Sequence, residues 1–87
     1  MRKTELTKEQ QKKFKWLMEA DTENENVEVS KFGHLIWKDG IWKNGTWEDG
    51  VWESGTWEGG EMWSNLKQKY IHVKWNKDKR KFKESLK

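Results

Sequence analysis

The chain has 87 residues and a formal net charge of +3, with 32% apolar and 38% charged residues. A chain of this length folds as one small domain, which excludes a large enzyme built from two domains around a deep cleft. The absence of cysteine excludes disulfide-stapled, zinc-thiolate and thiol-dependent classes. Only fifteen residues are Leu, Ile, Val or Phe, but eight are Trp, and one buried indole supplies roughly 200 Å² of apolar surface. The composition therefore predicts a core made mostly of indoles.

Charge is distributed unevenly along the chain. Residues 1–20 carry six basic and three acidic groups, residues 21–66 carry three and ten, and residues 67–87 carry nine and two. An acidic centre thus lies between two basic ends, and this asymmetry bears on partners rather than on fold. No apolar run has the length of a leader or a membrane span, so we expect a cytoplasmic protein with no membrane partner.

The N-terminal third predicts a helix and then an acidic connection. Residues 4–20 contain neither Gly nor Pro, and residues 7–10 fit a capping box, so we expect one helix there. Trp16 falls off the apolar stripe of this helix, which consists of Phe14, Leu17 and Met18. Residues 21–34 predict an acidic loop and a short strand at 27–29. We expect the helix to cover one end of the segment that follows.

A five-residue repeat occupies residues 35–63. Glycine and tryptophan each recur at one position of the repeat, as Gly40, Gly45, Gly50 and Gly55, and as Trp37, Trp42, Trp47, Trp52 and Trp57. On a helix, successive indoles would be rotated by about 140°, and in a straight strand they would alternate between faces. The chain is therefore expected to turn once per repeat, at the glycines, with Trp facing in and the β-branched residues facing out. Because Trp63 arrives one residue late, the array is expected to end there.

This pattern resembles the pentapeptide-repeat family over about residues 35–60. In that family, a small residue, a short polar or β-branched residue, a large central apolar residue and two polar residues form one side of a right-handed, four-sided β-helix. The pattern is also partly similar to the membrane-occupation (MORN) repeats, whose glycine- and aromatic-rich hairpins form a meander. The resemblance implies a mainly β fold: a short-repeat β-solenoid or meander, with an N-terminal capping helix and a C-terminal strand or hairpin, all in the single domain 1–87.

The basic C-terminal segment, residues 67–87, predicts a half-buried strand because Ile71, Val73 and Trp75 alternate with polar residues. Residues 76–87 form either a returning basic strand or a disordered tail. Lysines interleaved with aromatic residues are typical of a surface that grips nucleic acid by phosphate contact and base stacking. The candidate nucleic-acid-binding residues are Lys67, Lys69, Tyr70, Lys74, Lys77, Lys79, Arg80, Lys81 and Lys83, with Trp75 and Phe82 beside them.

An acidic face on the repeats is the alternative binding surface. Its candidate residues are Glu48, Asp49, Glu53, Glu58 and Glu61, with Asp39. By resemblance to pentapeptide-repeat proteins that mimic DNA in shape and charge, such a face would suit a small phage- or mobile-element-type inhibitor of a host nucleic-acid enzyme or defence protein. A third possibility is a structural module that forms a homodimer through an open end of the array.

Catalytic chemistry is not indicated by the sequence. His34 and His72 are far apart and lack ligand-spaced partners, so we expect no metal site, and no catalytic triad can be assembled. The glycines are spaced by five and match no phosphate-binding motif, so we expect no cofactor. The sequence therefore predicts a non-catalytic interaction protein.

Overall fold

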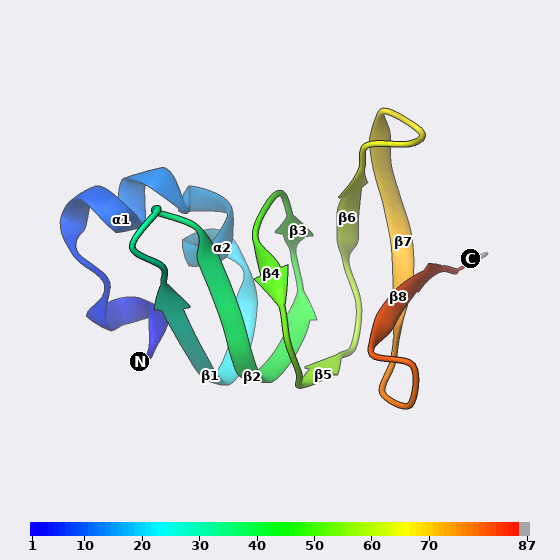
Figure 1. Cartoon of the computed structure of the whole chain (residues 1–87), viewed down its shortest axis with the longest axis horizontal. Helices are drawn as coiled ribbons and strands as arrows, with labels where there is room; N and C mark the ends of the chain where they lie inside the picture. Colours follow the sequence, from blue (N-terminus) through cyan, green and yellow to red (C-terminus); the bar gives the residue numbers. More distant parts are fainter. Residues whose placement is uncertain (86–87) are drawn as a thin grey trace.

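The computed structural model describes residues 1–85 and is mainly β, with short helical segments at the N-terminus (Figure 1). A 3₁₀ turn (Lys3–Glu5) precedes α1 (Lys8–Lys13) and α2 (Lys15–Glu19). The strands that follow are β1 (Asp21–Val29), β2 (Leu35–Asn44), β3 (Thr46–Trp47), β4 (Val51–Trp52), β5 (Thr56–Trp57), β6 (Glu61–Ser64), β7 (Lys69–Asn76) and β8 (Lys81–Glu84). They form two open sheets, one in the order β1-β2-β4 with β5 also paired to β2, the other in the order β3-β6-β7-β8.

The predicted helix is interrupted at Phe14. The capping box is confirmed, because Thr7 Oγ1 accepts from the backbone N–H of Gln10 and the Gln10 side chain accepts from the N–H of Thr7. Phe14, however, has φ −107° and ψ 45°, so α1 ends and α2 begins there. Trp16, which falls off the predicted apolar stripe, is nevertheless half-buried against the core. Its ring packs on the rings of Trp42 and Trp47, at centroid distances of 6.3 and 4.9 Å.

The acidic segment after α2 is a strand rather than a loop. β1 begins at Asp21 and pairs antiparallel with β2, with register shifts between Glu23 and Val27 and a positive φ of 53° at Asn24. The shifts let β1 follow β2 around a bend, because a bulge increases local twist and bends a strand. Pairing with the long strand β2 thus makes this segment a strand. Its acidic sequence alone does not predict that pairing.

Every parallel pairing in the array joins residues fifteen apart. Ile36 pairs with Val51 in β2 and β4, Ile41 with Thr56 in β2 and β5, and Thr46 with Glu61 in β3 and β6. Three pentads therefore separate a residue from its partner. The four-sided coil that the family resemblance implies would pair residues twenty apart, so the arrangement differs from it.

The expected end of the array at Trp63 is also corrected by this register. Trp47 pairs with Met62, so residues 60–64 form a sixth pentad in which Met62 occupies the tryptophan position. Trp63 falls at the polar position that follows, where it is only half-buried. The one-residue delay thus reflects a substitution of Met for Trp within the repeat.

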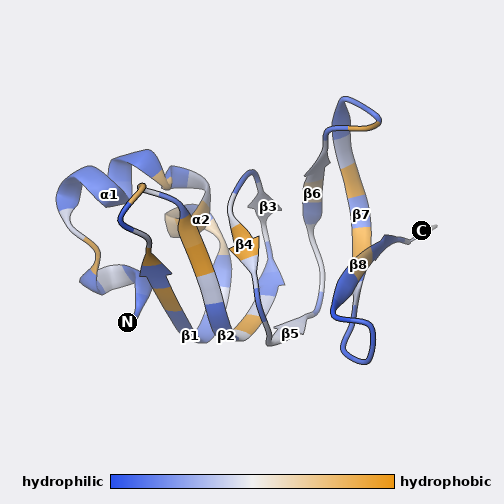
Figure 2. Cartoon of the chain, viewed as in Figure 1, coloured by the Kyte–Doolittle hydropathy of each residue, from blue (hydrophilic) through white to orange (hydrophobic). Residues whose placement is uncertain are grey.

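The indoles of the repeat face inward, as predicted. Trp37 and Trp42 have no exposed surface, and Trp47 and Trp52 are also buried. Indoles fifteen residues apart lie flat on one another, Trp37 on Trp52 at 4.9 Å and 6°, and Trp42 on Trp57 at 5.3 Å and 4°. Consecutive indoles meet edge to face, an arrangement that aromatic quadrupoles favour. Trp-bearing strands such as β3 and β5 are pale in Figure 2, so hydropathy alone does not locate this core.

Both ends of the indole column are covered. At the N-terminal end lie Trp16 and a layer of buried aliphatic and aromatic side chains, namely Leu6, Phe14, Leu17, Ala20 and Val27. At the other end, the rings of Trp75 and Phe82 lie 5.9 and 5.4 Å from the ring of Trp52. Side chains thus cover both ends of the column, and the homodimer through an open end stays a prediction.

A buried carboxylate anchors the N-terminus to β1. The side chain of Glu25 is 2% exposed and accepts hydrogen bonds from Arg2 Nε at 2.8 Å, the backbone N–H of Lys3 at 3.1 Å and Thr22 Oγ1 at 2.9 Å. Burial raises the pKa of Glu25, but the hydrogen bonds, led by that from Arg2, outweigh burial and lower the pKa to about 2. The ionised carboxylate is thus the form that the fold stabilises.

Acid should weaken this anchor. Because the folded pKa is lower than the ordinary value of 4.5, the stabilisation is complete above pH 4.5 and is lost as the pH falls toward 2. We expect the wild-type protein to lose about 2–3 kcal/mol of unfolding free energy across this interval beyond what Glu25→Gln loses. Urea titrations at several pH values measure the difference. Parallel pH profiles for the two proteins would contradict the assignment.

Candidate functional site

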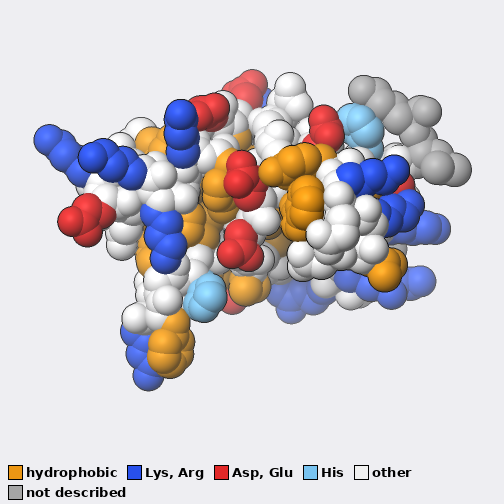
Figure 3. All heavy atoms as spheres, turned by 90° about the horizontal axis from the view of Figure 1, so that it is seen from above, with side chains coloured by type: hydrophobic (Ala, Val, Ile, Leu, Met, Phe, Trp, Pro, Cys, Tyr) orange, Lys and Arg blue, Asp and Glu red, His pale blue; other side chains and the backbone are white. Residues whose placement is uncertain are grey.

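The basic C-terminal segment forms an antiparallel hairpin of β7 and β8. Lys74 lies opposite Lys83, Trp75 opposite Phe82, and Asn76 opposite Lys81. Opposite residues share a face and successive residues alternate between faces. Lys74, Lys81 and Lys83 therefore lie on one exposed face, which we call the lysine face, while Trp75 and Phe82 face the array. In Figure 3, Lys and Arg side chains gather at the right-hand end, where β7 and β8 lie in Figure 1.

In the described part of the chain, the lysine face carries positive charge that is not neutralised by ion pairs. Within residues 1–85, no Asp or Glu oxygen lies within 4.0 Å of the ammonium groups of Lys74, Lys81 or Lys83. A hollow of about 430 Å³ opens beside them, lined by Asn76, Lys79, Lys81, Phe82 and Lys83. The hairpin thus combines an unneutralised lysine cluster with a recess that contains an amide and an aromatic ring.

Other predicted basic residues have different surroundings. Lys67 forms an ion pair with Glu84, and Arg80 Nη2 donates to the backbone carbonyl of Glu53 at 3.3 Å. Lys69 begins β7, away from the lysine face, and Tyr70 contacts the ring of Trp63 at 5.0 Å. Lys77 and Lys79 are exposed in the turn between β7 and β8, next to the lysine face. The residues brought together are therefore Lys74, Lys77, Lys79, Lys81 and Lys83.

The aromatic residues expected between the lysines differ in exposure: Tyr70 is exposed, whereas Trp75 and Phe82 are half-buried. Trp75 and Phe82 contact each other at 4.8 Å and cover the end of the indole column. Phe82 also borders the hollow beside the lysine face, and Trp75 borders another hollow with Lys77 and Arg80. Part of each ring thus packs on the core and part stays accessible next to basic residues.

The predicted acidic face is divided among the three parallel pairings. Glu48 follows β3, Glu53 follows β4 and Glu58 follows β5, so the three do not form one ladder. Parallel partners are fifteen residues apart, a spacing that we call the fifteen-residue stagger. It places Glu53 next to Lys38, and their side chains form an ion pair of 3.2 Å. The hydrogen bond that Lys38 donates to Glu53 is the main cause of the raised pKa of Lys38, and the charges of Glu28 and Glu53 raise it further. Asp49 and Glu61 remain on the side of Glu48, where β3 pairs with β6.

The described residues hold no group of three or more His, Cys, Asp or Glu side chains placed to bind a metal ion. His34 is exposed in the segment between β1 and β2, and His72 is half-buried in β7, on separate elements. Among residues 1–85, none of the helices has both the length and the apolar character needed to cross a bilayer.

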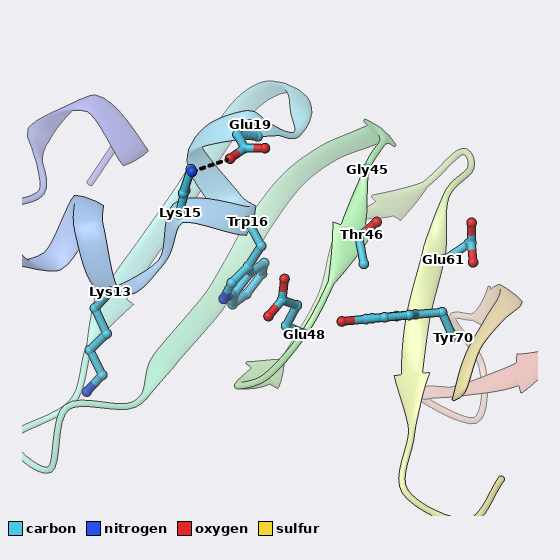
Figure 4. Close-up of a pocket in the computed structure, with 9 residues that line it drawn as sticks. All are labelled: Lys13, Lys15, Trp16, Glu19, Gly45, Thr46, Glu48, Glu61 and Tyr70. Carbon is cyan, nitrogen blue, oxygen red and sulfur yellow. Dashed lines mark ion pairs between the residues drawn. The ribbon is translucent and has the colours of Figure 1, made fainter. Parts of the chain in front are cut away.

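Residues that the sequence analysis assigned to separate features line the space between the helices and β6. Trp16, Glu48 and Tyr70 border one hollow there (Figure 4). Trp16, Glu48 and Trp63 border a second hollow that adjoins it. The signal that could have identified Trp63 is the glycine at position 60, which starts a sixth pentad and puts Trp63 at an outward position.

We compared the chain with protein-family models, curated proteins and solved structures, and none of them matches it.

Proposed function

We propose that this chain is a non-catalytic binding module that holds nucleic acid on the lysine face of its C-terminal hairpin. The observation that carries the proposal is the pairing of Lys74 with Lys83 directly across the two strands, with Lys81 on the same face. Like charges in this position destabilise a strand pair. A phosphate chain relieves that repulsion, because each contacted phosphate neutralises a lysine and releases a counterion.

The surroundings of the lysines support the same ligand. Lys77 and Lys79 extend the positive surface into the turn, and Asn76 and Phe82 supply an amide and a ring edge in the adjoining hollow. A lysine is a point charge that fits a phosphate from many directions, and it reads no base sequence. The proposed binding is therefore electrostatic and tolerant of sequence.

The rigid support for this surface is proposed to be a short three-sided β-solenoid. The fifteen-residue stagger supports this description, as do the edge-to-face contacts among Trp37, Trp42 and Trp47, which meet pairwise at 5.5–6.4 Å. The six pentads from residue 35 to residue 64 would make two turns. The hairpin then closes the last turn and presents its lysines away from the column.

Removal of the lysine face should weaken nucleic-acid binding and make it less dependent on salt. Fluorescence anisotropy with a labelled oligothymidylate measures affinity across a salt series. For the triple variant Lys74→Gln, Lys81→Gln and Lys83→Gln, we expect the slope of log K against log salt to become shallower by about 2, since each phosphate contact on a single strand contributes roughly 0.7. The matched control neutralises three exposed lysines elsewhere, Lys8, Lys12 and Lys31, with the same loss of net charge. Equal effects of the two triple variants would contradict the proposal.

A further inference from the structure

Two hollows adjoin between the N-terminal helices and the last strands. One of about 690 Å³ reaches Glu61 and Tyr70, and the other of about 620 Å³ reaches Trp63. Both are bordered by Lys13, Trp16 and Glu48, so they form one groove on the side of the array where β3 pairs with β6. We call it the Trp16 groove.

Aromatic rings in fixed positions line this groove. The ring of Trp16 rests against the buried ring of Trp47 at 4.9 Å, so it is supported from behind. Trp63 Nε1 donates to Asn65 Oδ1 at 2.9 Å, and its ring meets that of Tyr70 edge to face at 5.0 Å. Trp16 and Trp63 are half-buried and Tyr70 is 41% exposed, so each ring keeps accessible surface. A groove with preplaced aromatic surface loses little entropy when it binds a ligand.

The carboxylates in the groove lack cationic partners. Within residues 1–85, no ammonium or guanidinium nitrogen lies within 4.0 Å of a carboxylate oxygen of Glu48, Asp49 or Glu61. Glu53, which follows the tryptophan of the next pentad as Glu48 does in its own, forms an ion pair with Lys38. Figure 4 shows the Glu48 carboxylate between the rings of Trp16 and Tyr70.

The two lysines at the rim do not neutralise this site. Lys13 Nζ donates to the backbone carbonyl of Gly33 at 2.7 Å, and in Figure 4 its side chain extends away from Glu48. Lys15 forms an ion pair of 3.7 Å with Glu19 on its own helix, at the far rim. The centre of the groove therefore combines aromatic surface with negative charge.

We infer that the Trp16 groove binds the cationic side chains of a basic peptide segment, with a guanidinium or ammonium group placed over an indole and next to Glu48. A ring face attracts a cation through its quadrupole, and a carboxylate beside the ring adds a charge-assisted hydrogen bond. Arginine suits the site best, because its planar group stacks on an indole while it donates to a carboxylate. The groove is lined by none of Lys74, Lys81 and Lys83, so this inference does not rest on nucleic-acid binding.

The test titrates ¹⁵N-labelled protein with an acetylated, amidated tetra-arginine peptide and follows the indole N–H resonances. We expect the signals of Trp16 and Trp63 to shift while those of the enclosed Trp37, Trp42, Trp52 and Trp57 stay in place. Trp16→Phe and Trp63→Phe each remove one signal and so assign the pair. Glu48→Gln should weaken binding about fivefold to tenfold, because it removes one favourable charge next to the bound cation.

Glu58→Gln is the matched control, since Glu58 follows tryptophan in its own pentad but stands on another side of the array. Unchanged affinity is expected for it. Equal weakening by Glu48→Gln and Glu58→Gln would show diffuse attraction between charges and overturn the inference. The inference would also be overturned if the peptide left the Trp16 and Trp63 signals unshifted, or if they shifted with a neutral oligosaccharide such as cellopentaose and not with the peptide.

Discussion

Replacing Gly60 by alanine should lower the free energy of unfolding by about 2–5 kcal/mol. Two effects add. The residue has a φ of +109°, a conformation that costs a side-chain-bearing residue about 1–2 kcal/mol. A methyl group at this position would also overlap the backbone carbonyl of Gly45 and lie 2.9 Å from its nitrogen, and forced overpacking costs about 1–3 kcal/mol. The clash is with the backbone of Gly45, fifteen residues earlier in the chain, and backbone atoms cannot rotate aside as a side chain can.

The neighbouring residue is a matched control for this effect. Gly59 lies outside the positive-φ region, and a methyl group there would come no closer than 3.3 Å to the carbonyl oxygen of Lys43. Gly59→Ala should therefore change stability by less than about 1 kcal/mol. Urea unfolding followed by tryptophan fluorescence measures both variants. If the two variants lost similar amounts of unfolding free energy, the close approach of the backbone at Gly60 would not be the reason that glycine is required there.

The sequence predicts the local geometry of the array well. The glycines at period five mark the corners, and all of Gly40, Gly45, Gly50, Gly55 and Gly60 have positive φ. The inward direction of the indoles also follows from a chain that must turn once per repeat. The number of pentads per turn does not follow, because it depends on the angle of each corner. That angle depends on packing between pentads, a long-range effect that the residues within one pentad do not encode.

The same distinction applies to the candidate sites. Alternation along β7 correctly separates Lys74 from Val73 and Trp75. The pairing of Lys74 with Lys83, however, depends on the turn at residues 77–80, and the sequence left open whether a second strand exists. The Trp16 groove depends on the break at Phe14 and on the displaced Trp63, which come from opposite ends of the chain. Only the fold brings these two residues into one groove.

The stagger of fifteen residues is open to a direct covalent test. The chain has no cysteine, so a pair introduced by mutation reacts without competition. Ile36 and Val51 are direct partners in parallel strands, and both side chains are on the outward positions of the repeat. Neighbouring strands place such partners about 5 Å apart, within the range that a disulfide spans. Ile36→Cys with Val51→Cys should therefore oxidise to an intramolecular disulfide that stabilises the protein by about 3 kcal/mol, as expected for a loop of this length.

The control pair distinguishes a three-sided from a four-sided arrangement. Ile36→Cys with Thr56→Cys separates the cysteines by four pentads, the spacing at which a four-sided coil would place partners side by side. In the structure, Thr56 is instead the partner of Ile41, one side further along the chain. Mild oxidation followed by mass spectrometry should show the disulfide in the first variant and free thiols in the second. The reverse result would replace the fifteen-residue stagger with one of twenty. The stacked indole pairs Trp37–Trp52 and Trp42–Trp57, which depend on that stagger, would then have to be abandoned as well.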